Sequence, residues 1–395
     1  MHLAIVSPFP PSITGIGQYG YHVTRSLAKS GAFSRVTVLA GSKLNGEHPN
    51  HLGITELEYC WGPGQLNARQ AILSRVKQLN PDLVWFNLGA SVFGRSPWMN
   101  ISGLLTPMLI QKMGLPTVLT LHELAELSDL RALDAPGGPF AQLGARLLTE
   151  IATRADVICL TMRNYAELLM SRRIECAHIP IGAYHEPDLL DESERQELLF
   201  FTTLAPFKGL ELLLEAFNIL RKEYPRLQLT IAGTEHTRFP NYVHELRKHF
   251  NGTEEIHWLG QVPEDNVMEL FRRAQIVVLP YTASTGSSSV LYQAATWGRA
   301  VVVSDLKEIR ELTNESNLMV EYFKGGDVQS LCIAIRVLLN SPEKRRAQTR
   351  HNFDSIQHAR PEATCRKYIE VFNYALKIHG SKNRILMSSE TLETG

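Results

Sequence analysis

Long apolar runs, paired cysteines and an excess of one charge are all missing from this chain. No run approaches the roughly 18 apolar residues that a membrane-spanning helix requires. Lysine plus arginine number 40, as do aspartate plus glutamate, which leaves a formal net charge of zero. This balance argues against a nucleic-acid partner, because proteins that bind nucleic acid concentrate basic charge.

Cysteine is scarce and scattered: the chain has five, an odd number, and none forms a C-x-x-C pair. This usage favours reduced thiols of a cytosolic protein. The opening MHLAIVSPFP lacks a basic segment and has only a short apolar run, so it predicts a first strand and not a signal peptide. We therefore expect a cytoplasmic protein, and peripheral contact with the inner face of the membrane stays open.

Apolar strand-like runs alternate with helical patterns along the chain. Several runs are nearly continuous, such as IVVL at 276–279, which is typical of parallel strands covered on both faces. The alternation predicts a doubly wound α/β fold. The predicted strands are 3–7, 36–40, 83–87, 117–121, 157–160, 178–181, 198–202, 227–232, 256–259, 276–280, 300–304 and 318–320. The predicted helices are 19–30, 67–79, 141–154, 210–223, 265–274, 328–339 and 361–377.

The 395 residues exceed what one core usually supports and fit two domains. An acidic stretch without apolar periodicity interrupts the alternation after residue 182. We predict domains at 1–185 and 195–355 on either side of it. The polar tail at 381–395 is predicted to be disordered.

The first candidate site is a glycine series, Gly15, Gly17 and Gly20, that follows the opening strand. Glycines at such a turn allow positive φ and let a ligand reach the backbone. The loop before them is longer than that of a dinucleotide-binding turn. A phosphate or sugar loop and a plain tight turn are both consistent with the pattern.

His122 comes directly after the apolar run at 117–121, at the carboxyl end of a predicted strand. Open α/β sheets bind ligands at that end. A histidine there can donate to a substrate hydroxyl or to a developing negative charge. A purely structural histidine is the alternative.

Lys208 and Gly209 open the predicted helix at 210–223. A lysine at a helix N-terminus is unfavourable unless an anion offsets it, because the helix dipole is positive there. A solvated surface lysine is the alternative.

A glycine-serine loop joins another predicted strand to a helix. Free amides and hydroxyls at a helix start suit a phosphate or sugar hydroxyls, and a serine-rich helix cap is the alternative. The loop residues are Thr285, Gly286, Ser287, Ser288 and Ser289.

Over roughly residues 1–378 the chain resembles the retaining GT-B glycosyltransferases of family 4. The similar stretches are SPFPPSITGIGQYG, LTLHE, TTLAPFKGLELLLEAF, IHWLGQV, AQIVVLPY, the loop at 285–293 and ATWGRAVVVSD, in family order. The resemblance implies two Rossmann-like domains facing across a cleft, with the acceptor bound by the first and a nucleotide-sugar by the second. A helix at 361–378 would cross back to the first domain.

The resemblance also implies roles for individual residues. Lys208 would bind the donor diphosphate, His122 would contact the sugar, and Gly15 and Gly17 would let the first loop approach the phosphate. The reaction implied is transfer of a sugar to an acceptor hydroxyl with retention, a hexosyltransferase activity serving glycan, glycolipid or polysaccharide synthesis. The apolar stretch at 89–113 suits a lipid-linked acceptor or a buried helix.

Three positions depart from the family pattern. Thr203 stands where an arginine is expected, and Thr285 and Gln293 replace two glutamates. Neutral groups bind phosphate and ribose more weakly than charged ones. Arg272, Arg273 and Arg299 lie near in sequence as possible replacements for the arginine.

No D-x-D triplet occurs, and no histidine or cysteine cluster has ligand spacing, so we expect neither a metal nor another cofactor. A non-catalytic glycosyltransferase-like subunit that binds a sugar nucleotide or a partner enzyme is the main alternative. An epimerase would need acid-base carboxylates, for which Glu123 and Glu126 are the candidates. A dehydrogenase is disfavoured because the second strand does not end in an acidic residue. The oligomeric state is left open.

Overall fold

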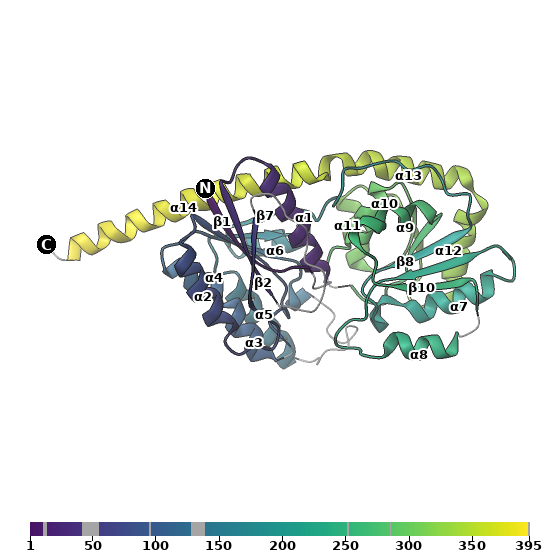
Figure 1. The fold of residues 1–395 in the computed structure, drawn as a ribbon, viewed down its shortest axis with the longest axis horizontal. Coiled ribbons are helices and arrows are strands. Elements are labelled where there is room, and N and C mark those ends of the chain that lie inside the picture. The colour runs from purple at the N-terminus through teal and green to yellow at the C-terminus, as the bar shows by residue number, and fades with distance from the viewer. Residues whose placement is uncertain are drawn as a thin grey trace. The chain divides into compact units, whose positions relative to one another are not determined.

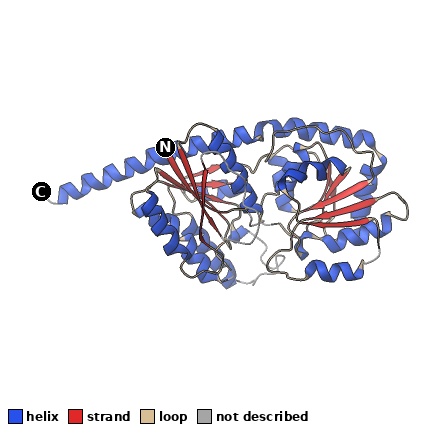
Figure 2. Ribbon diagram, viewed as in Figure 1, coloured by secondary structure: helices blue, strands red, loops and turns tan. Residues whose placement is uncertain are grey.

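The computed structural model of the protein describes residues 1–10, 14–41, 55–94, 96–127, 139–250, 253–284 and 286–393. The chain divides into two compact units, each with its own parallel sheet (Figures 1 and 2). Unit 1 contains the described residues of 1–180 together with 361–393, and unit 2 contains 181–360. The predicted α/β fold class is confirmed. No helix within the described residues is both long and apolar enough to cross a membrane.

The sheet of unit 1 has, within the described residues, seven parallel strands in the order β3-β2-β1-β4-β5-β6-β7. The chain runs outward from β1 to β3 and then returns to add β4 on the other side of β1. The strands are β1 His2–Pro8, β2 Arg35–Gly41, β3 Thr55–Trp61, β4 Leu83–Leu88, β5 Thr117–Leu121, β6 Val157–Leu160 and β7 Cys176–His178. The helices are α1 Gly15–Lys29, α2 Ala68–Leu79, α3 Pro97–Leu104, α4 Thr106–Lys112, η1 Ala125–Leu127, α5 Pro139–Ala152, α6 Arg163–Ser171 and α14 Pro361–Glu393.

The sheet of unit 2 repeats this topology with the order β10-β9-β8-β11-β12-β13 among the described residues. The strands are β8 Glu197–Phe201, β9 Gln228–Ala232, β10 Ile256–Gly260, β11 Ile276–Leu279, β12 Ala300–Ser304 and β13 Glu321–Phe323. The helices are η2 Pro206–Lys208, α7 Leu210–Leu220, α8 Tyr242–His249, η3 Glu264–Asn266, α9 Val267–Arg273, α10 Ser289–Thr296, α11 Lys307–Glu315, α12 Val328–Asn340, α13 Pro342–Ile356 and η4 Gln357–Ala359.

Each sheet therefore has a topological switch point, where chain connections leave neighbouring strands in opposite directions. The switch lies between β1 and β4 in unit 1 and between β8 and β11 in unit 2. Open α/β sheets bind ligands at the carboxyl ends of the strands on either side of such a point.

The first helix begins earlier than predicted. Thr14 caps it, because the Thr14 side-chain oxygen accepts from the Gly17 backbone N–H at 3.0 Å. Gly15 and Gly17 therefore lie in the first turn of α1, and neither has a positive φ. The expectation that these glycines form a turn of unusual φ before the helix is wrong. A Cβ at Gly15 would meet no atom within 4 Å, so its open surface still permits close approach of a ligand.

The last helix, α14, follows unit 2 in sequence and packs on unit 1, which confirms the predicted crossing helix. The Tyr368 hydroxyl lies 2.7 Å from that of Tyr19 on α1 and 2.9 Å from Thr120 Oγ1 on β5. The structure continues the helix to Glu393, through residues that the sequence analysis assigned to a disordered tail. No proline occurs after Pro361, and the single Gly380 lowers helix propensity without ending the helix.

Candidate active site

The ends of β1 and β4 are joined by side-chain hydrogen bonds at the switch point of unit 1. Asn87 Nδ2 donates to Ser7 Oγ at 2.8 Å and to the Ile16 carbonyl oxygen at 2.9 Å. Asn87 and Ser7 are fully buried. Helix α1 packs closely on β1 at Gly20, where a Cβ would lie only 2.4 Å from Ser7 Oγ. The third glycine of the series thus serves helix-strand packing.

His122 lies beside this network, directly after β5. Its Nε2 is 2.6 Å from Asn87 Oδ1. Both N–H groups of Asn87 are used as donors, so Oδ1 must accept and His122 Nε2 must carry the hydrogen. Burial lowers the pKa of His122 to about 3, which keeps the ring neutral. Nδ1 is then a hydrogen-bond acceptor. Neutral His122 can accept from a hydroxyl but has no second N–H to donate, so the donor role predicted from the sequence does not fit this geometry.

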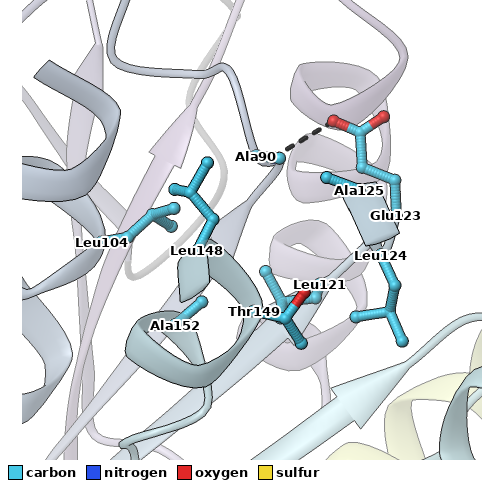
Figure 3. Close-up of a pocket in the computed structure, with 9 residues that line it drawn as sticks. All are labelled: Ala90, Leu104, Leu121, Glu123, Leu124, Ala125, Leu148, Thr149 and Ala152. Atoms are coloured by element: carbon cyan, nitrogen blue, oxygen red, sulfur yellow. Dashed lines mark hydrogen bonds between the residues drawn. The ribbon is translucent and has the colours of Figure 1, made fainter. Parts of the chain in front are cut away.

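Glu123, the next residue, borders a small pocket in unit 1 (Figure 3). Its Oε1 accepts from the Ala90 backbone N–H at 3.1 Å, so the carboxylate faces the loop after β4. The other walls are mainly apolar and come from α3, β5, η1 and α5. The lining residues are Ala90, Leu104, Leu121, Glu123, Leu124, Ala125, Leu148, Thr149 and Ala152.

In unit 2, Lys208 ends the short helix η2 just before α7. Its Nζ lies 3.9 Å from the centroid of the Tyr281 ring, which follows β11. Across the part of the chain that the structure describes, no carboxylate forms an ion pair with Lys208. The ammonium group therefore lies on an aromatic face at the β8/β11 switch point, where the α7 dipole adds positive potential.

Two glycines hold the loops around Lys208 together. Gly209 has φ +70, and a Cβ there would lie 1.9 Å from the Pro280 carbonyl oxygen. Gly233 has φ +132, and a Cβ there would lie 1.8 Å from the Thr202 carbonyl oxygen. The loops after β8, β9 and β11 thus meet backbone to backbone. The structure gives Gly209, a predicted binding residue, a clear packing role.

The predicted glycine-serine loop leads into α10 in unit 2. Ser288 is its N-cap residue but makes no side-chain cap, and no acidic residue lies in the first turn. Ser287 Oγ is buried and has no hydrogen-bond partner among the described residues. Ser289 is the first residue of α10. Ser284 Oγ donates to the Gly286 carbonyl oxygen at 3.1 Å. The helix start therefore keeps backbone donors and one hydroxyl for an anion or a sugar.

Two predicted residues of this region remain. Gln293 lies one turn further along α10 and is buried. Thr285 lies outside the described residues.

The arginines proposed to replace the missing one at Thr203 are engaged elsewhere. Thr203 itself is half-buried in the turn between β8 and η2. Arg299 donates to the carbonyl oxygens of Phe271 and Asp191. Arg273 pairs with Glu197 at 3.5 Å, and Arg272 pairs with Glu269 at 3.1 Å.

Sequence reasoning missed Asn87, although it named the strand that this residue ends. The available signal was a polar residue closing an apolar parallel strand, the same signal that identified His122. The contacts that make Asn87 important come from residues up to 80 positions away, and no local pattern shows them.

The chain superposes on crystalline Anabaena Alr3699/HepE in complex with UDP-glucose with a TM-score of 0.70 and 15% identity, covering 95% of this chain and 100% of that one. The sucrose-phosphate synthase of Thermosynechococcus elongatus gives a TM-score of 0.67 and 16% identity, covering 98% and 100%. The chain has the GT-B fold. At these identities the likeness establishes the fold alone.

Residues 195–341 of this GT-B chain match the family model described as Glycosyl transferases group 1. The uncharacterized glycosyltransferase YqgM of Bacillus subtilis is 27% identical over 173 residues, 44% of this chain and 47% of that protein. The phosphatidyl-myo-inositol mannosyltransferase of Mycobacterium tuberculosis is 27% identical over 174 residues, 43% of this chain and 44% of that protein. The chain thus spans less than half the length of these curated relatives. The predicted GT-B resemblance is confirmed at the level of the fold and of a group 1 segment in unit 2.

Proposed function

We propose that the protein is a retaining, metal-independent glycosyltransferase of family 4 that uses a nucleotide-diphosphate sugar and an acceptor hydroxyl. The observation that carries the proposal is Lys208, a cation without a carboxylate partner among the described residues, at the switch point of the unit that matches the group 1 glycosyl transferases. Its position at the α7 N-terminus is unfavourable until an anion binds there. A diphosphate supplies that anion.

The chemistry follows from the charge on the leaving group. When the glycosidic phosphate bond breaks, the departing diphosphate gains negative charge, and groups already aimed at it stabilise the transition state. Lys208 and the uncapped start of α10 supply such groups in unit 2. In the front-face route implied by the family resemblance, the leaving phosphate oxygen accepts the proton of the acceptor. A protein nucleophile is then unnecessary.

His122 contributes an acceptor in this account. Its Nδ1 accepts a hydrogen bond from a sugar hydroxyl, which orients the ring without adding charge. Because the imidazole is held neutral by burial, it does not act as a general acid near neutral pH. We therefore assign His122 to sugar positioning.

The acceptor is proposed to be a hydroxyl on an amphiphilic molecule such as a glycolipid. Support comes from the similarity to phosphatidyl-myo-inositol mannosyltransferases, whose name specifies a lipid acceptor. An acceptor of this kind would be met at a membrane surface by peripheral contact of a cytoplasmic enzyme.

A non-catalytic subunit is the second candidate, because Thr203 and Gln293 replace charged residues of the family pattern. An activity assay distinguishes an active glycosyltransferase from a non-catalytic subunit. The protein is incubated in EDTA with UDP-, GDP-, ADP- and dTDP-sugars and glycolipid acceptors, and both the nucleoside diphosphate and the glycosylated product are measured.

An active enzyme loses about tenfold or more of its turnover on Lys208→Ala or His122→Ala, whereas Lys248→Ala leaves turnover unchanged. Lys248 is a matched control because it is an exposed lysine of the same unit, paired with Glu245. Donor binding without turnover under any of these conditions would favour the non-catalytic subunit.

A further inference from the structure

The loop that follows β9 lies against the loop that carries Lys208. The Leu204 backbone N–H donates to the Thr234 carbonyl oxygen at 2.8 Å, and the His236 N–H donates to the Leu204 carbonyl oxygen at 2.9 Å. β8 and β9 are neighbours in the sheet, so these bonds extend their pairing past the strand ends. Residues 233–239 therefore reach the same edge of the sheet as Lys208.

Aromatic rings join the two loops. The Phe207 ring lies 6.0 Å from the His236 ring and 5.9 Å from the Phe239 ring, measured between centroids. Lys208 Nζ lies 5.7 Å from the centroid of Phe207, and the guanidinium carbon of Arg238 lies 5.3 Å from that of Phe239. Two basic side chains are thus held on one aromatic cluster.

The charges of Lys208 and Arg238 both affect the pKa of His236. Burial lowers its pKa first, and the charges of Arg238 and Lys208 lower it further. The Arg238 backbone N–H also donates to His236 Nδ1 at 3.2 Å, which requires a neutral acceptor nitrogen. His236 is therefore neutral, and the charges of both Arg238 and Lys208 act on its ring.

Glu235 lies in the same loop and accepts through Oε1 from the Val243 backbone N–H in the first turn of α8, at 2.7 Å. Lys208 and Arg238 bring positive charge to the start of α7, where the helix dipole also favours a bound anion.

We propose that Arg238 is the second cation of the donor site and binds the diphosphate together with Lys208. The assignment rests on the proposed function and deepens it. Thr203 stands where the family pattern has an arginine. Arg238 supplies that positive charge from the neighbouring loop. An arginine suits this role because its planar guanidinium group can donate two parallel hydrogen bonds to phosphate oxygens.

The experiment measures the binding of nucleoside diphosphates and monophosphates by calorimetry in EDTA. UDP, GDP, ADP and dTDP identify the base that the wild-type protein prefers, and the matching monophosphate is then measured. The variants are Arg238→Ala and Arg247→Ala. Arg247 is the control because its guanidinium carbon lies 5.1 Å from the Trp258 ring centroid, a similar stacking elsewhere in unit 2.

We expect Arg238→Ala to raise the dissociation constant of the diphosphate about tenfold and that of the monophosphate by less than about threefold. Arg247→Ala should change neither. Equal losses for both nucleotides would indicate a general structural role and overturn the assignment, as would binding within about twofold of wild type. If wild-type protein binds no nucleotide, the proposed function and this assignment fail together. If wild-type protein binds a diphosphate and Arg238→Ala binds it equally well, this assignment alone is refuted.

Discussion

His122 and Asn87 share a 2.6 Å hydrogen bond that determines what the histidine can do. The asparagine amide uses both of its N–H groups on Ser7 and Ile16, so only its oxygen is left to face the imidazole. The hydrogen of this bond therefore belongs to His122 Nε2, and because burial keeps the ring neutral, Nδ1 is left as an acceptor. The same amide holds the first turn of α1, which links the glycine series to the histidine.

Replacing Asn87 with aspartate tests this link. A carboxylate beside the ring favours the imidazolium form, so Asn87→Asp should raise the pKa of His122 from about 3 by about two units or more. Titration of the histidine side chains by NMR measures the change directly. An unchanged pKa would show that Asn87 does not control the ring. Asn87→Ser, which adds no charge, is the control and should leave the pKa low.

The pH dependence of stability follows from the same residue. The folded state keeps His122 neutral down to about pH 3, whereas in the unfolded chain it takes up a proton near pH 6.5. Acid therefore favours the unfolded state, and stability is lost as the pH falls from 6.5 toward 3, by up to about 1.4 kcal/mol per pH unit.

Urea unfolding at pH 7.5 and 5.0 checks this expectation. Wild-type protein should lose about 1 to 2 kcal/mol more between the two conditions than His122→Gln, which has no group to titrate. Equal losses in both proteins would contradict the low pKa. Because only the difference between the two proteins is used, the contribution of the other histidines cancels.

Gly209 is predicted to be indispensable for packing around Lys208. Gly209→Ala adds a Cβ at φ +70 and places it 1.9 Å from the Pro280 carbonyl oxygen. We expect it to lower the free energy of unfolding by about 2 kcal/mol or more. Gly326→Ala is the matched control, with φ +76 but no atom within 4 Å of the new Cβ, and should lose only about 1 kcal/mol. Similar losses in the two variants would mean that backbone strain, and not the contact with Pro280, decides the effect.

The central strands were predictable because burial on both faces makes their sequences continuously apolar. The edges were not. β3 carries Glu56 and Glu58 and is half-exposed, so it lacks an apolar run and was missed. β7 and β13 are short edge strands, and the predicted segments 178–181 and 318–320 were displaced from them by a few residues. An edge strand is defined by its neighbour in the sheet, which local sequence does not reveal.

The residues of the candidate site also fall into those that the sequence predicts and those that it does not. His122 and Lys208 were found because each stands at a junction between a strand and a helix that a linear pattern can show. Asn87 and Arg238 were not found, because their roles depend on loops brought together by the order of strands in each sheet. The shift of the α1 start had a local cause: Thr14 is a good N-cap residue that the prediction overlooked.

A thermal-shift panel of UDP-, GDP-, ADP- and dTDP-sugars with EDTA present tests the donor site directly. A ligand that binds only the folded protein raises its apparent stability. We predict that one nucleotide class stabilises the wild-type protein and that Lys208→Ala abolishes the shift while Lys248→Ala retains it. If no nucleotide-sugar produced a shift, or if Lys208→Ala kept it in full, the proposed donor site would be contradicted.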